Sequence, residues 1–128
     1  MDKGRSMQQV SEQERAAQAW HDVGGVSASL GPKYGSQARR LATLIQTNGL
    51  AQTVAFLRSK RGNEEMTRVY GHLCTWVMRR MREQGDLLEA ITRWSSATYR
   101  RATTEALAYA LWLRRFAEAR GWGEEEAE

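Results

Sequence analysis

The feature that most constrains the fold is an amphipathic stretch in the middle of the chain, from Met66 to Met81. Its apolar residues recur three or four positions apart, which is the spacing of one side of an α-helix. They form a broad stripe made of Met66, Val69, Tyr70, Leu73, Trp76, Val77 and Met81. A helix with such a stripe is stable only when other elements cover it. The sequence therefore predicts a helix packed inside a larger bundle, with Asn63 as its N-cap and Gly85 at its end.

The rest of the chain carries helical patterns separated by residues that stop helices. The further predicted helices span about residues 7–23, 32–48, 50–58, 87–91 and 97–120. The chain has one proline, Pro32, which is well placed to open the second helix, and no runs of residues that favour strands. We therefore expect an all-α fold, a single-domain compact bundle of about six helices. This domain spans residues 1–123, and an acidic, disordered tail follows at 124–128.

The balance of charge points to an anionic partner. The chain holds 19 basic and 15 acidic residues, and four of the acids lie in the last five positions. Without those four, 19 basic residues face 11 acidic ones, a formal charge of +8. Sixteen of the basic residues are arginine, whose planar guanidinium binds phosphate bidentately. Nucleic acid is one interpretation, and a genome that favours arginine at solvated positions explains the same composition.

The sequence offers no credible catalytic constellation. The only histidines are His21 and His72 and the only thiol is Cys74, and His72 and Cys74 point to different faces of a helix. We therefore expect a non-enzyme with no catalytic residues, no metal site and no cofactor. A single cysteine indicates a reducing compartment, and the longest apolar run, Ala106–Leu113, is too short to cross a bilayer. With no secretory signal recognisable at residues 1–15, the expected location is the cytoplasm, away from membranes.

Basic residues recur in patterns that could follow a phosphate backbone. Arg68, Arg79 and Arg82 follow helical spacing together with His72 and Thr75, opposite the apolar stripe, and no acid interrupts them. Further basic groups are Arg39-Arg40, Arg58 with Lys60-Arg61, Arg100-Arg101 and Arg114-Arg115. Any one of them alone is more often a solvated face than a binding site. Taken together they favour phosphate binding about as much as simple solvation.

Three segments resemble one protein family. LIQTNGLAQTVAFL, residues 44–57, resembles the signature of the small α-helical subunit of type III-B CRISPR–Cas (Cmr, RAMP module) effector complexes. RAAQAW, from Arg15, resembles the first helix of that family, and YRRATTEALAYALWLRRFAEA, residues 99–119, resembles its closing helix. The likeness covers most of the chain up to Trp122. The helix–Asn-Gly–helix motif, with its amide-rich start and Phe-Leu end, is not generic bundle sequence.

The resemblance implies a non-catalytic, antiviral role. Family members stack in several copies along the backbone subunits that hold the CRISPR RNA, and line the groove where target RNA pairs with its guide. The implied partners are the backbone and large subunits of the Cmr complex, further copies of this chain, CRISPR RNA and target RNA. As a hypothesis, the RNA contacts are Arg58, Lys60, Arg61, Arg68, Arg79, Arg82, Arg114 and Arg115. The last two match the basic pair of the family's closing helix.

Two other classes of function remain as alternatives. One is a purely structural adaptor whose arginines meet acidic neighbours and never touch RNA. The other is a helical DNA-binding regulator, which needs a recognition helix with base-reading side chains. The helix around Met66 to Met81 is too apolar to lie in a DNA groove, so this second alternative is the weaker one.

Overall fold

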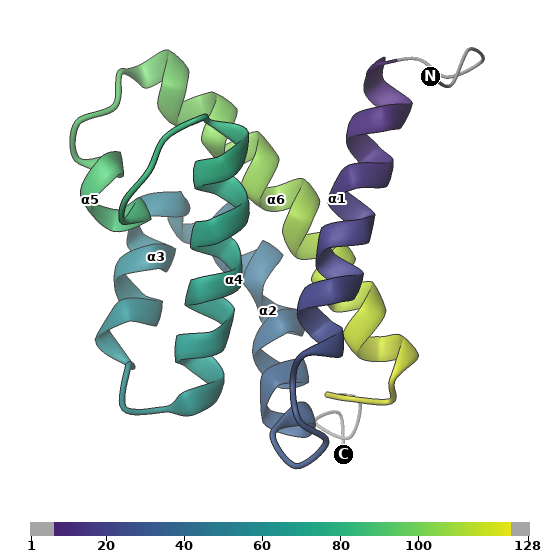
Figure 1. Cartoon of the computed structure of the whole chain (residues 1–128). Coiled ribbons are helices and arrows are strands. Elements are labelled where there is room, and N and C mark those ends of the chain that lie inside the picture. Colours follow the sequence, from purple (N-terminus) through teal and green to yellow (C-terminus); the bar gives the residue numbers. More distant parts are fainter. Residues whose placement is uncertain (1–6, 124–128) are drawn as a thin grey trace.

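The computed structural model describes residues 7–123, which form an all-α bundle (Figure 1). Its helices are α1 (Met7–Gly24), α2 (Gly31–Asn48), α3 (Leu50–Ser59), α4 (Glu64–Arg80), α5 (Leu87–Ile91) and α6 (Ser96–Ala119). The predicted all-α class, with six helices in one compact domain, is therefore confirmed for the described residues. The predicted acidic tail at 124–128 lies outside them. No helix in this part of the chain combines the length and apolarity needed to span a bilayer.

The closing helix, α6, organises the bundle. It runs diagonally across the molecule, and α1, α2 and α4 all pack against it (Figure 1). Its buried seam consists largely of small residues, Ala102, Ala106, Ala110 and Ala117, joined by Tyr109 and Leu113. Small side chains let three helices approach the same axis closely, so one long helix serves as the common partner of the others.

The Asn48-Gly49 break lets α2 and α3 bury their apolar sides in the same core. Gly49 has a φ of +89°, a conformation that glycine adopts without strain, and its amide donates to the Ile45 carbonyl at 2.8 Å. After the break, Leu50, Val54 and Leu57 of α3 are fully buried. The Tyr99 hydroxyl of α6 accepts a hydrogen bond from the Ala51 amide at 3.0 Å and fixes the start of α3. The break therefore turns one rod into two helices on one core.

The helix α4 ends at Arg80, before the predicted stop at Gly85, so that expectation was wrong. Residues 81–86 form a turn in which Arg82 has a φ of +59°. The Glu83 amide closes this turn by donating to the Met78 carbonyl at 2.9 Å. Asp86 then caps α5, because its carboxylate accepts from the Glu89 amide at 3.3 Å. Arg82 therefore leaves the helical spacing that the sequence assigned to it.

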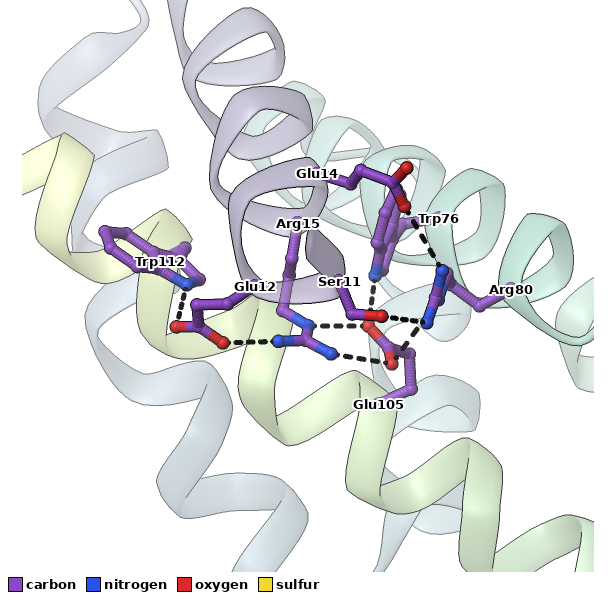
Figure 2. A network of polar contacts seen from close by, with 8 residues as sticks. All are labelled: Ser11, Glu12, Glu14, Arg15, Trp76, Arg80, Glu105 and Trp112. Atoms are coloured by element: carbon purple, nitrogen blue, oxygen red, sulfur yellow. Dashed lines mark hydrogen bonds and ion pairs between the residues drawn. The ribbon is translucent and has the colours of Figure 1, made fainter. Parts of the chain in front are cut away.

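A polar network centred on Glu105 of α6 ties α1 and α4 together (Figure 2). Arg15 of α1 binds the Glu105 carboxylate with two hydrogen bonds, of 2.7 and 3.1 Å, and the Trp76 indole N–H of α4 donates to it at 2.7 Å. Arg80 approaches the same carboxylate at 3.6 Å. Burial alone would raise the pKa of Glu105, but the hydrogen bonds from Arg15 and Trp76 hold that pKa below its ordinary value. The network therefore keeps a buried carboxylate ionised.

Candidate nucleic-acid interface

The structure distributes the eight predicted RNA contacts over three regions. Arg58, Lys60 and Arg61 lie at the corner between α3 and α4. Arg68 and Arg79 lie on α4, and Arg82 lies in the turn that follows it. Arg114 and Arg115 lie near the end of α6. The three regions differ in how far their charges are already neutralised within the molecule.

At the α3–α4 corner, Arg58 is tied to the fold. Its guanidinium forms an ion pair with Asp86 at 2.9 Å, donates to the Tyr70 hydroxyl at 3.2 Å and lies over the Tyr70 ring. Burial would raise the pKa of Asp86, yet hydrogen bonds from Tyr70 and Arg58 lower it. Burial, followed by the hydrogen bond to Asp86, raises the pKa of Tyr70 to about 12. Arg58 therefore helps to hold α3, α4 and the α5 cap together.

At the same corner, the side chains of Lys60 and Arg61 form no hydrogen bond or ion pair among residues 7–123. Lys60 is exposed, and its ammonium lies 5.6 Å from the centre of the Phe56 ring. Arg61 is exposed as well, and only its backbone carbonyl is engaged, accepting from the Thr67 hydroxyl at 3.0 Å. Within residues 7–123 neither side chain forms an ion pair with an acid. Their two charges therefore stay available to an external anion.

The α4 arginines face α1 and the loop that follows it. Arg68 donates to the Gly25 carbonyl at 2.9 Å. Arg79 donates to the Gln18 side chain at 3.1 Å and lies over the Trp76 ring. These hydrogen bonds tie both arginines to α1 and its loop, while the side chain of Arg79 remains exposed. Arg82 stays in its turn, apart from the other two.

His72 belongs to the fold as well. Its Nδ1 lies 2.8 Å from the Tyr34 hydroxyl of α2, and burial lowers the pKa of the imidazole. Burial also raises the pKa of the Cys74 thiol, which disfavours the thiolate form that attacks substrates or binds metals. The described residues contain no group of three or more metal-ligating side chains.

Near the end of α6, Arg114 and Arg115 share one carboxylate. Both guanidinium groups lie 3.1 Å from Glu118, and hydrogen bonds from Arg114 and then Arg115 lower the pKa of Glu118. One carboxylate thus faces two guanidinium groups, so Arg114, Arg115 and Glu118 together keep a net positive charge. Arg115 has a side chain that is 71% exposed, against 38% for Arg114, so Arg115 is the more accessible of the two.

A further basic surface, outside the eight predicted contacts, lies where α4 ends beside α6. A cleft of about 730 Å³ lies there, and its lining includes Arg80, Arg100, Arg101 and Glu105. Arg100 and Arg101 are exposed and form no ion pair among the described residues. Their doublet was visible in the sequence, but its proximity to Arg80 depends on how α4 packs on α6.

Comparison with known proteins assigns the chain to a family. A sequence model described as CRISPR-associated protein (Cas_Cmr5) matches residues 11–120. The fold also matches the crystal structure of a CRISPR-associated Cmr5 family protein from Thermus thermophilus, with a TM-score of 0.72 and 28% sequence identity. That match covers 84% of this chain and 95% of the Thermus protein. The chain belongs to the Cmr5 family of CRISPR-associated proteins, which supply the small subunit of type III-B Cmr complexes.

Proposed function

We propose that this subunit is a non-catalytic, RNA-binding structural element of a cytoplasmic type III-B effector complex. Several copies stack along the backbone subunits and line the groove that holds the guide RNA–target RNA duplex. Its partners are the backbone and large subunits, neighbouring copies of the chain, CRISPR RNA and target RNA. Family membership supports the place in the complex, and the uncompensated basic side chains support the contact with RNA.

The observation that carries RNA binding is the absence of acidic partners around the exposed basic residues. Among residues 7–123, Lys60, Arg61 and Arg82 form no ion pair, and Arg114 with Arg115 share a single glutamate. Phosphate contacts need guanidinium and ammonium groups that are not already neutralised. The first candidates of the predicted eight are the exposed side chains that make no hydrogen bond to another helix or loop among the described residues, namely Lys60, Arg61, Arg82 and Arg115. The other four predicted residues would contact RNA while keeping their hydrogen bonds or ion pairs within the molecule; they are Arg58, Arg68, Arg79 and Arg114.

Charge reversal in the assembled complex tests the proposal. The Arg61→Glu variant should assemble with its partner subunits and retain less RNA, with a weaker dependence of affinity on salt. Arg93→Glu is the matched control, because Arg93 is similarly exposed but already pairs with Glu83 and Glu89. Unchanged RNA retention by reversals at Arg61, Arg82 and Arg115 in an intact complex would favour the purely structural adaptor.

A further inference from the structure

Two adjoining hollows form a groove along α2 and α3. The first, of about 520 Å³, is lined by α2 and by Arg114 of α6. The second, of about 320 Å³, is lined by α2 and α3. Arg40 and Leu44 line both hollows, so the two adjoin. We call this depression the α2–α3 groove.

One row of side chains runs along this groove through the Asn48-Gly49 break. The row consists of Gln37, Arg40, Leu44, Asn48, Gln52 and Phe56, spaced three or four residues apart. Its members from Leu44 onwards belong to the LIQTNGLAQTVAFL motif. Packing explains the other apolar members of that motif, such as Ile45 and Leu50, because they are buried. Core packing does not explain Gln52 and Phe56, which are exposed.

The groove carries positive charge with no acid in its lining. Neither hollow includes an aspartate or glutamate, whereas the cleft at Arg100-Arg101 includes Glu105. The side chain of Arg40 hydrogen-bonds only to the neutral amide of Gln37, at 3.3 Å, and within residues 7–123 it forms no ion pair. An anion entering the groove would therefore meet an uncompensated guanidinium beside carboxamide groups.

Phe56 adds an aromatic face to this basic, amide-rich lining. Its side chain is 36% exposed, although Val54 and Leu57 of the same helix are buried. An aromatic ring next to arginine and carboxamide groups suits unpaired nucleotides, because a base stacks on the ring and offers its edge to amides. A continuous RNA duplex keeps its bases stacked on one another and would leave the Phe56 ring with its internal contact alone, the Lys60 ammonium 5.6 Å from the ring centre.

We propose that the α2–α3 groove binds unpaired RNA nucleotides, with Phe56 stacking on a base and Arg40 binding a phosphate. Gln52 and Asn48 lie between them and hydrogen-bond to base edges or ribose hydroxyls. This inference rests on the proposed function for the class of ligand. The eight residues predicted from sequence are all basic and can bind phosphate. The groove adds an aromatic ring and carboxamide groups, which can bind an unpaired base.

Solution NMR of the full-length chain tests the inference, because it maps even weak binding to individual residues. A hexauridylate, a short blunt-ended RNA duplex and a hexaglutamate are titrated separately into the labelled protein. The expected result is that the hexauridylate shifts resonances of Arg40, Asn48, Gln52 and Phe56 more strongly than the duplex does, while hexaglutamate leaves the Phe56 ring unaffected.

Two variants sharpen the test. Phe56→Ala should weaken hexauridylate binding by about tenfold, the scale of losing one base–aromatic stack, and should change duplex binding by less than about twofold. Trp20→Ala is the matched control, since it removes an aromatic side chain that is 52% exposed outside the groove. Arg40→Gln replaces the guanidinium by a neutral carboxamide, so it removes the charge and should lower both the affinity and its salt dependence.

The outcomes separate this inference from the proposed function. One outcome is that hexauridylate shifts mainly the resonances of Lys60, Arg61 or Arg115 and that Phe56→Ala binds it as tightly as the parent chain. This outcome would overturn the assignment of the groove and leave RNA binding by the subunit intact. Equal responses to hexaglutamate and hexauridylate at the groove would overturn it in favour of an acidic protein partner. No response to either RNA at millimolar concentration would overturn both the groove and direct RNA binding by the subunit.

Discussion

Replacement of Glu105 by alanine removes the carboxylate at which α1, α4 and α6 meet. The side chains of Glu105 and Arg15 are each only 12% exposed, so the pair is largely shielded from water. The variant would leave the Trp76 indole N–H without its acceptor and Arg15 with only the exposed Glu12. Hydrogen bonds to charged groups contribute about 1.5–3 kcal/mol each, and removing one partner of a buried ion pair costs about 3–5 kcal/mol. We therefore expect a loss of about 3 kcal/mol in the free energy of unfolding.

Urea and thermal unfolding followed by circular dichroism measure this loss. For a chain of this size, about 3 kcal/mol corresponds to a fall of roughly 10 °C in Tm. Glu89→Ala is the matched control, because Glu89 is 68% exposed and its ion pair with Arg93 should contribute less than about 1 kcal/mol. A double-mutant cycle with Arg15→Ala should show a coupling above about 1 kcal/mol. A loss below about 1 kcal/mol for Glu105→Ala, equal to the control, would refute the reasoning.

Three further predictions concern pH and packing. The folded-state pKa of Glu105 lies below its ordinary value of 4.5, so the ionised carboxylate stabilises the fold above pH 4.5 and this stabilisation is lost as the pH falls through the folded-state pKa. In urea unfolding, Glu105→Gln should therefore lose less unfolding free energy in acid than the parent chain does. Burial lowers the pKa of His72 from 6.5, so stability should fall as pH drops below that value, and His72→Gln should flatten this dependence in the same assay. Gly31→Ala would drive a Cβ into the Trp122 ring and should cost about 1–3 kcal/mol of stability, measured by thermal unfolding, whereas an unchanged Tm would contradict this contact.

The helices were predictable because their signals are local. The apolar stripe from Met66, the Asn48-Gly49 break and the Asp86 cap each lie within a few residues of the structure they dictate. The end of α4 was not predictable in this way. Met81 continues the apolar spacing, but its side chain packs against the core from a turn, and Arg82 takes a positive φ.

The candidate interface was harder to predict because charge availability depends on tertiary partners. The partner of Arg15 is Glu105, 90 residues away, and that of Arg58 is Asp86. Helical spacing placed Arg68 and Arg79 on one face of α4, but spacing alone does not show that their guanidinium groups hydrogen-bond to Gly25 and Gln18. Helical spacing correctly places Leu50 and Leu57 on the buried side of α3, but it does not show that Phe56 lies beside a hollow shared with α2.

The most direct test of the central claim is to purify the tagged chain from its native host, sequence the bound RNA and identify the bound proteins. The account predicts that CRISPR RNA and the other Cmr subunits are recovered together with the chain, and that the Arg61→Glu variant recovers the subunits with less RNA. Recovery of the Cmr subunits without any dependence of RNA content on the exposed arginines would contradict RNA binding by this subunit. Recovery of neither RNA nor Cmr subunits would contradict its place in the complex.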